Sequence, residues 1–285
     1  MGSGSWSSEA YTKRVTMDWG FNSVDSLASS SVQSIYRSRS LDTMLNPKNV
    51  VRECCDSDEH PTTIPVILGL DVTGSMGNAC KMCAAKLDEI MEKLYSEVEH
   101  VQFMMMGIGD LSYDSAPIQA TQFESDIRIL DQTAKVWFES GGGGNRYESY
   151  TAAWYFGLHN TKLDCWNRGK KGIIITLGDE PCNPYLPYRE LNAALGSKEQ
   201  GDVDTTELYR EACEKFDIYH IAITDESSYW RYKDMIKDSW GNLLGQNLVI
   251  ASTDELPKVI SDIVTDATRG STFSTVTVTE DGIMW

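Results

Sequence analysis

Residues 66–76 read VILGLDVTGSM, and this stretch joins a strongly apolar segment to a polar turn. The apolar run begins at Ile64 and stops at Asp71, and hydroxyl side chains follow at Thr73 and Ser75. A continuous apolar run of this length is typical of a strand that is covered on both faces. Gly74 allows a tight turn, so the end of the predicted strand presents one carboxylate and two hydroxyls close together.

The pattern of apolar runs alternates between strand-like and helix-like segments along the rest of the chain. The predicted strands span 64–71, 101–110, 117–124, 171–179, 217–225 and 247–252. The predicted helices span 76–98, 126–139, 148–159, 187–195, 205–216, 228–240 and 256–267. This alternation predicts a Rossmann-like, doubly wound α/β fold, with a mostly parallel central sheet and helices on both faces.

A second carboxylate follows another apolar run, at Asp179 in TLGDE (176–180). In open α/β sheets, ligands bind beyond the carboxyl ends of the strands, where the strand order reverses. If the two strands are neighbours, Asp71 and Asp179 converge with the hydroxyls of Thr73 and Ser75. Oxygen ligands of this kind suit Mg²⁺, or another hard divalent cation such as Mn²⁺ or Ca²⁺.

The order of these motifs resembles that of a von Willebrand factor type A (vWA) domain over residues 62–268. The metal-ion-dependent adhesion site of that family has the pattern D-x-S/T-x-S, then a Thr in a Gly-rich loop, then an Asp. Asp71, Thr73 and Ser75 match the first element, and Asp179 matches the last. The Gly-rich loop GGGGNRYES (141–149) departs from the pattern, because Asn145 or a nearby residue stands where the family usually has Thr.

The resemblance, closest to intracellular vWA proteins of bacteria and phages, implies a protein-binding module and not an enzyme. It implies metal ligands at Asp71, Thr73, Ser75 and Asp179, with Asn145 as a further candidate. It also implies a protein partner that supplies an acidic residue to the metal. Intracellular vWA proteins often act as adaptors beside AAA+ ATPases of the MoxR type, so such an ATPase is an expected partner.

Composition and charge limit the binding partners and the cellular compartment that we expect for this chain. The chain has 285 residues and a formal net charge of −17, which disfavours nucleic acid and anionic membranes as partners. No apolar run approaches the ~20 residues that span a bilayer, and the N-terminus has no apolar signal-peptide segment. Together with the odd number of cysteines, 7, these features predict a cytoplasmic protein, or a virion component if a phage encodes it.

The first 61 residues form a Ser-rich arm with several aromatic side chains, predicted to pack on the domain or on a neighbouring subunit. The vWA-like domain is predicted over 62–270, and the tail 271–285 is a candidate for one more strand. An arm and a tail of this kind also allow a structural role, as a subunit of a homo-oligomer or a virion.

Three other interpretations of the motifs compete with a metal-binding module. The D-x-T-x-S motif can serve only to cap a helix. A haloacid-dehalogenase-type phosphatase also begins with an Asp after its first strand, but it usually needs a second Asp where this chain has Thr73. Cys80 and Cys83 form a CxxC, which would need ligands such as Cys54, Cys55 or His60 to bind zinc. The cysteines otherwise serve as small buried apolar groups.

Overall fold

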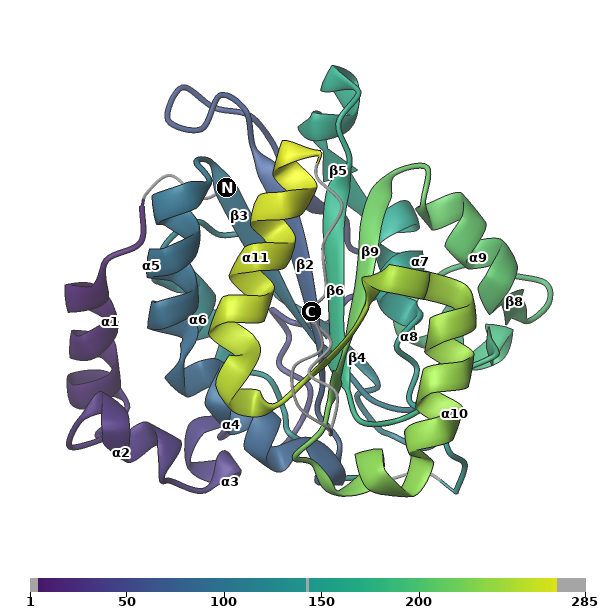
Figure 1. Ribbon diagram of the computed structural model, residues 1–285, viewed down its shortest axis with the longest axis horizontal. Helices are drawn as coiled ribbons and strands as arrows, with labels where there is room; N and C mark the ends of the chain where they lie inside the picture. The colour runs from purple at the N-terminus through teal and green to yellow at the C-terminus, as the bar shows by residue number, and fades with distance from the viewer. Residues whose placement is uncertain (1–4, 142–143, 271–285) are drawn as a thin grey trace, which may run out of the picture.

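The computed structural model describes residues 5–141 and 144–270, and their core is a six-stranded sheet (Figure 1). Its strands are β2 (Ile64–Asp71), β3 (Val101–Ile108), β4 (Ile118–Ala120), β6 (Gly172–Gly178), β9 (Phe216–Ile223) and β10 (Leu248–Ala251). Their spatial order is β10-β9-β6-β2-β3-β4, and all pairs are parallel except β3 with β4. The predicted α/β fold with a mostly parallel central sheet is therefore confirmed.

Helices cover both faces of the sheet, as predicted (Figure 1). One face carries α4 (Gly77–Ala85), α5 (Leu87–Glu97), α6 (Arg128–Thr133) and α11 (Leu256–Arg269). The other carries α7 (Ala152–His159), α8 (Tyr188–Leu195), α9 (Thr205–Ala212) and α10 (Ser227–Leu244). Within the described residues, no helix has both the length and the apolar character that a bilayer crossing requires.

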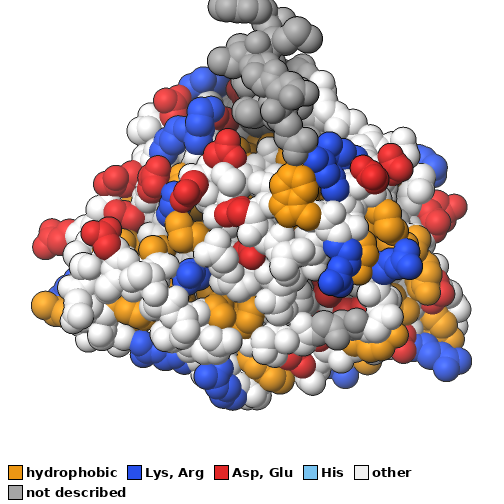
Figure 2. Space-filling view, turned by 60° about the horizontal axis from the view of Figure 1, so that its bottom comes forward, with side chains coloured by type: hydrophobic (Ala, Val, Ile, Leu, Met, Phe, Trp, Pro, Cys, Tyr) orange, Lys and Arg blue, Asp and Glu red, His pale blue; other side chains and the backbone are white. Residues whose placement is uncertain are grey.

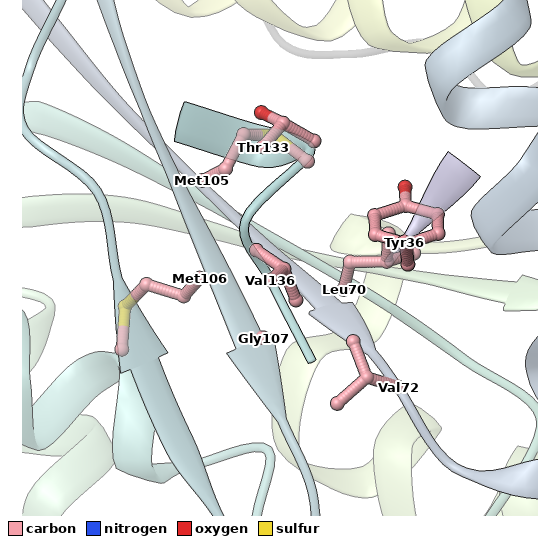
Figure 3. Close-up of a pocket in the computed structure, with 8 residues that line it drawn as sticks. All are labelled: Tyr36, Leu70, Val72, Met105, Met106, Gly107, Thr133 and Val136. Atoms are coloured by element: carbon pink, nitrogen blue, oxygen red, sulfur yellow. The ribbon is translucent and has the colours of Figure 1, made fainter. Parts of the chain in front are cut away.

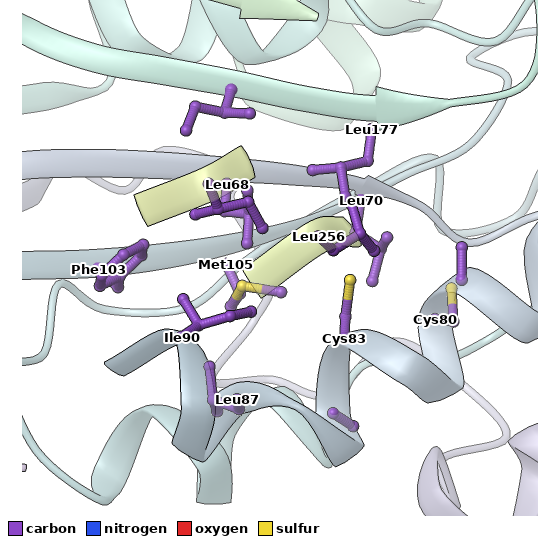
Figure 4. Packing of buried hydrophobic residues seen from close by; sticks show 14 of the residues in the cluster. Leu68, Leu70, Cys80, Cys83, Leu87, Ile90, Phe103, Met105, Leu177 and Leu256 are labelled. Carbon is purple, nitrogen blue, oxygen red and sulfur yellow. The ribbon is translucent and has the colours of Figure 1, made fainter. Parts of the chain in front are cut away.

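Strand β2 lies at the centre of the core because both of its faces are apolar. Leu68 and Leu70 point toward the face covered by α4 and α5, in one cluster with Cys83 of α4 and Met105 of the neighbouring strand β3, as Figure 4 shows. Ile67 points to the opposite cluster, as the two-residue period of a strand requires. Burial on both faces leaves no position in β2 for a charged side chain before its last residue, Asp71.

Several elements differ in detail from the sequence prediction. The helix predicted over 76–98 is interrupted at Lys86, and the one predicted over 126–139 is only one and a half turns long. Two small strand pairs were not predicted: parallel β1 (Arg52–Cys54) with β5 (Thr161–Leu163), and antiparallel β7 (Tyr185–Leu186) with β8 (Val203–Asp204). Short 3₁₀ turns lie at Gly74–Met76, Asp164–Arg168, Gly245–Asn247 and Thr253–Glu255.

The N-terminal arm packs on helices α4 and α5 of its own chain. It contains α1 (Ser8–Lys13), a π-helical turn (Arg14–Asp18), α2 (Val24–Ala28) and α3 (Val32–Ile35). Tyr11, Leu27 and Tyr36 are fully buried in the same cluster as Leu70. Tyr36 lies over the end of β2 beside a small apolar hollow lined by Leu70 and Val72 (Figure 3). The predicted extra strand in the tail lies outside the described residues.

A side chain of the arm contacts the break between α4 and α5. The Tyr11 hydroxyl lies 3.0 Å from the carbonyl oxygen of Ala84 and 2.9 Å from that of Ala85. These carbonyls are at the end of α4, where helical partners run out. The arm therefore supplies the donor that the interrupted helix lacks.

We expect Tyr11→Phe to lower the free energy of unfolding by about 1–3 kcal/mol, because it leaves buried carbonyl groups without their donor. Urea unfolding of the full chain measures this change. Tyr185→Phe is the matched control, since Tyr185 is 50% exposed. Equal unfolding midpoints for Tyr11→Phe and the wild type would contradict this role of the arm.

Candidate metal centre

The candidate site lies where the strand order reverses. The chain leaves β2 toward β3 and β4 on one side, and returns to β6, β9 and β10 on the other. Strands β2 and β6 pair directly, with Leu70 opposite Leu177. Asp71 is the last residue of β2 and Asp179 follows the last residue of β6. The two strands are therefore neighbours, as the predicted site requires, and they pair at the point where the strand order of the sheet reverses.

Asp71 is fully buried, and both of its carboxylate oxygens accept hydrogen bonds. The Thr73 backbone N–H and hydroxyl donate to Oδ1 at 2.9 and 2.6 Å. The hydroxyl of Tyr150, at the start of the segment leading into α7, donates to Oδ2 at 2.7 Å. Asp71 is therefore held in one orientation, with Thr73 directly in front of it.

Asp179 has a similar arrangement around its buried carboxylate. The Ser75 hydroxyl donates to Oδ1 at 2.9 Å. The backbone N–H of Ser228, in the first turn of α10, donates to Oδ2 at 2.9 Å. A helix N-terminus favours a nearby negative charge, so α10 helps to hold this carboxylate.

A pocket of about 200 Å³ opens in front of these two pairs. Its lining residues are Thr73, Gly74, Ser75, Gly141, Asn145, Glu148, Glu180 and Ser228. Asp71 and Asp179 are absent from the lining and lie behind the hydroxyls of Thr73 and Ser75. Each hydroxyl donates its proton backward to a carboxylate, which leaves its oxygen lone pairs free to face the pocket.

Glu148 is the residue of the site that the sequence prediction did not name. Its side chain lines the pocket, the residue is only 3% exposed, and its Oε2 atom has no hydrogen-bond partner. Its backbone forms an isolated bridge with that of Cys182, which brings the Gly-rich loop beside the end of β6. A buried carboxylate oxygen without a partner is costly in a dry interior and is the kind of atom that a cation would satisfy.

Asn145 also lines the pocket, but its side chain has other partners. Its Nδ2 donates to Asp110 Oδ2 at 2.5 Å, and its Oδ1 accepts from the Tyr147 N–H at 3.0 Å. The loop is fixed to the first motif by the Gly74 N–H, which donates to the Gly141 carbonyl at 3.0 Å. The structure thus brings all five predicted residues to one place, and Asn145 as a metal ligand stays a prediction.

The electrostatics of the site favour an added positive charge. Burial, and then the charge of Asp179, raise the pKa of Asp71 to about 8. Burial, and then the charges of Asp71 and Glu180, raise the pKa of Glu148 to about 11. The pKa of Glu180 rises to about 7, first through burial and then through Asp179. Ionised carboxylates here repel one another, and a cation would relieve that repulsion.

The donor set fits a hard divalent cation. Thr73, Ser75 and Glu148 line one pocket, the Glu148 Oε2 atom is buried there without a partner, and oxygen is the ligand that Mg²⁺, Mn²⁺ and Ca²⁺ prefer. Within 5–141 and 144–270, no group of three or more His, Cys, Asp or Glu side chains could hold a metal ion. The site would therefore depend on hydroxyl ligands, and the described residues offer no zinc site of the kind that the CxxC motif raised.

The CxxC cysteines are part of the core. Cys80 and Cys83 are buried on α4, and burial raises the pKa of both thiols. The Cys80 thiol donates to the Asp71 carbonyl, with 3.1 Å between sulfur and oxygen. Both thiols are therefore protonated and pack in the core. The Cys80 hydrogen bond also links α4 to the end of β2.

Comparison with known proteins gives structural similarity without sequence similarity. No family model matches the sequence, and no curated protein matches it. The fold is similar to the pilus adhesin SpaC of Lactobacillus rhamnosus GG in its open conformation (11% identity, TM-score 0.49, 78% of this chain and 31% of that one). The match thus spans about a third of SpaC.

Two further solved structures are similar over a comparable part of this chain. One is the vWF domain of the type V pili tip protein Mfa5 from Porphyromonas gingivalis (11% identity, TM-score 0.47, 76% of this chain and 98% of that one). The other is proximal thread matrix protein 1 from the mussel byssus (12% identity, TM-score 0.47, 75% of this chain and 49% of that one).

Tyr150, whose hydroxyl donates to Asp71, packs closely over Gly178. Substitutions at these two positions therefore test the contact that orients Asp71. A Cβ atom at position 178 would overlap the Tyr150 ring and hydroxyl. We expect Gly178→Ala to lower the free energy of unfolding by about 2–4 kcal/mol, because it displaces a buried ring. In a Tyr150→Ala background the same change should cost little, and chemical unfolding of the four proteins measures this coupling. Additive costs would show that Tyr150 does not occupy this place.

Proposed function

We propose that the chain is a protein-binding module whose binding site contains a divalent cation, of the kind found in vWA domains. The observation that carries the proposal is the pocket at the strand switch point. There, two hydroxyls are each backed by a buried carboxylate, and they share a pocket with Glu148, whose Oε2 atom is buried without a hydrogen-bond partner. The α/β fold with this strand order supports the same proposal, because such folds bind ligands at this position.

In this proposal, Thr73, Ser75 and Glu148 would hold the cation directly, and Asp71 and Asp179 would hold the two hydroxyls in place. The bound cation would supply positive charge and an open position for an oxygen atom of the partner. Gly74 and Asn145 at the mouth of the pocket are exposed, so a partner can approach from solvent. In this proposal every protein group binds or orients.

Three finer parts of the proposal come from the sequence resemblance. The first is that a partner carboxylate completes the cation site. The second is that the partner is, or works beside, an AAA+ ATPase of the MoxR type, with the chain as an adaptor or assembly component. The third is that the protein acts inside a bacterial cell, or in a virion if a phage encodes it.

We expect the wild-type protein to take up Mg²⁺ or Mn²⁺, and Ser75→Ala to weaken this binding by about tenfold or more. Loss of an oxygen ligand, together with a less well held Asp179, accounts for the effect. Titration calorimetry on the full chain measures it. Ser96→Ala is the control, since Ser96 is exposed on α5 and remote from the carboxyl ends of the strands.

The same variants test protein binding. Tagged wild type, Ser75→Ala and Ser96→Ala would capture partners from the native host, with Mg²⁺ or with a chelator. The proposal expects one set of partners that is lost both in Ser75→Ala and in the chelator. A protein that takes up no divalent cation, or an identical partner set in all samples, would refute the proposal.

Cation binding should strengthen as pH rises from about 6 to 8. The raised pKa values of Asp71 (about 8) and Glu180 (about 7) mean that both carboxyl groups gain negative charge over this range. The cation favours the ionised forms, so its uptake should also release protons. Calorimetry in buffers of different ionisation heat measures the released protons, and a pH-independent affinity without proton release would contradict this account of the site.

A further inference from the structure

Two arginine residues belong to segments that line the candidate cation pocket. Arg146 follows Asn145 in the Gly-rich loop, and Arg231 lies on α10, three residues after Ser228. Both residues are exposed, and in the ranges 5–141 and 144–270 neither forms an ion pair. Neither guanidinium group has a carboxylate within ion-pair distance in the described residues, so both are open to an acidic group of a partner.

Contacts tie both guanidinium groups to this part of the molecule. Arg146 Nη1 lies 3.9 Å from the Met235 sulfur, so the Arg146 side chain spans from the loop to α10. Ser228, Arg231 and Met235 share one face of α10 by their spacing. The positive charge of Arg231 acts on the carboxylate of Glu180, which lines the pocket.

An exposed aromatic side chain lies beside the Gly-rich loop, since Tyr113 is 58% exposed and sits next to Gly144. Trp230 is 59% exposed, but its spacing on α10 places it on the flank away from Ser228 and Met235. Figure 2 shows the face at the carboxyl ends of the strands, where Lys and Arg side chains lie beside exposed hydrophobic ones. Aromatic residues and arginines are the side chains most enriched at the energetic centres of protein interfaces.

We propose that this rim, formed by Tyr113, Arg146 and Arg231, binds an acidic peptide segment of a partner protein that carries at least two nearby carboxylates. One carboxylate approaches the cation pocket, and a second is held by the guanidinium groups. The inference rests on the cation site proposed above and adds the chemistry of the partner. In this proposal the rim, and not the pocket alone, selects the partner.

Charge and shape together favour this occupant. A guanidinium group binds a carboxylate through two parallel hydrogen bonds, which gives orientation as well as attraction. The chain as a whole is acidic, so the two guanidinium groups provide a local attraction for an acidic segment. The exposed Tyr113 ring beside the Gly-rich loop offers contact area next to the two guanidinium groups, which suits a peptide segment better than a small isolated anion.

The test uses the full chain and fluorescein-labelled peptides in which two Asp residues are separated by none, one, two or three Gly residues, with Leu on each flank. Matched peptides carry one Asp and one Asn, and a further set carries one phosphoserine. Anisotropy titrations in Mg²⁺ should show, for at least one spacing, about tenfold tighter binding of the two-Asp peptide than of its one-Asp partner. The double variant Arg146→Ala/Arg231→Ala should lose that preference.

Two controls separate this inference from the cation site. Arg189→Ala should keep the preference, because Arg189 is exposed on α8 and packs on Tyr188. Calorimetry should show that the double variant still takes up Mg²⁺ with the wild-type affinity or better.

The outcomes distinguish the two proposals. A wild type that takes up Mg²⁺ but prefers no two-Asp peptide would overturn this inference and leave the cation site standing. Tighter binding of the phosphoserine peptides would overturn it in favour of a phosphate ligand. Uptake of no divalent cation at all would refute both proposals.

Discussion

The direct pairing of β2 with β6 is the constraint on which the rest of the site depends. Both strands are buried, and both end in the middle of the sheet, where successive connections diverge to opposite sides. A carboxylate immediately after each strand therefore enters the same small volume. Every other feature of the site, from the turn at Thr73 to the start of α10 at Ser228, is arranged around those two carboxylates.

Burying acidic groups so close together carries a free-energy cost that the surrounding residues only partly offset. Hydrogen bonds from Thr73 and Tyr150 to Asp71, and from Ser75 to Asp179, each favour the ionised form. Burial works against them and raises the pKa of both groups. The Glu148 oxygen without a partner adds to the imbalance. A divalent cation in the pocket would offset the cost of burying the two carboxylates and would give the Glu148 oxygen a partner. The same cation would form the proposed binding site.

Much of this arrangement was predictable because it is local in sequence. The runs IPVILGLD and KGIIITLGD are typical of buried strands, and an acid at the end of each is then expected at the same edge of a parallel sheet. The break at Lys86 was not predictable, since the Tyr11 hydroxyl that supports it comes from a distant part of the chain. Glu148 was missed for a similar reason: its place depends on a bridge to Cys182, and nothing in NRYESY distinguishes it from a solvated acid. The predicted domain boundaries, ligands and partners remain predictions.

The most direct measurement of the central claim is an anomalous diffraction map of crystals of the full chain grown with Mn²⁺. The account predicts one strong peak in the pocket, within coordination distance of the Thr73 and Ser75 hydroxyl oxygens and of the Glu148 carboxylate, about 2.0–2.3 Å. The second oxygens of Asp71 and Asp179 should keep their present hydrogen bonds to Tyr150 and Ser228. A pocket without an anomalous peak at saturating Mn²⁺, or a peak held only by residues elsewhere on the surface, would contradict the account.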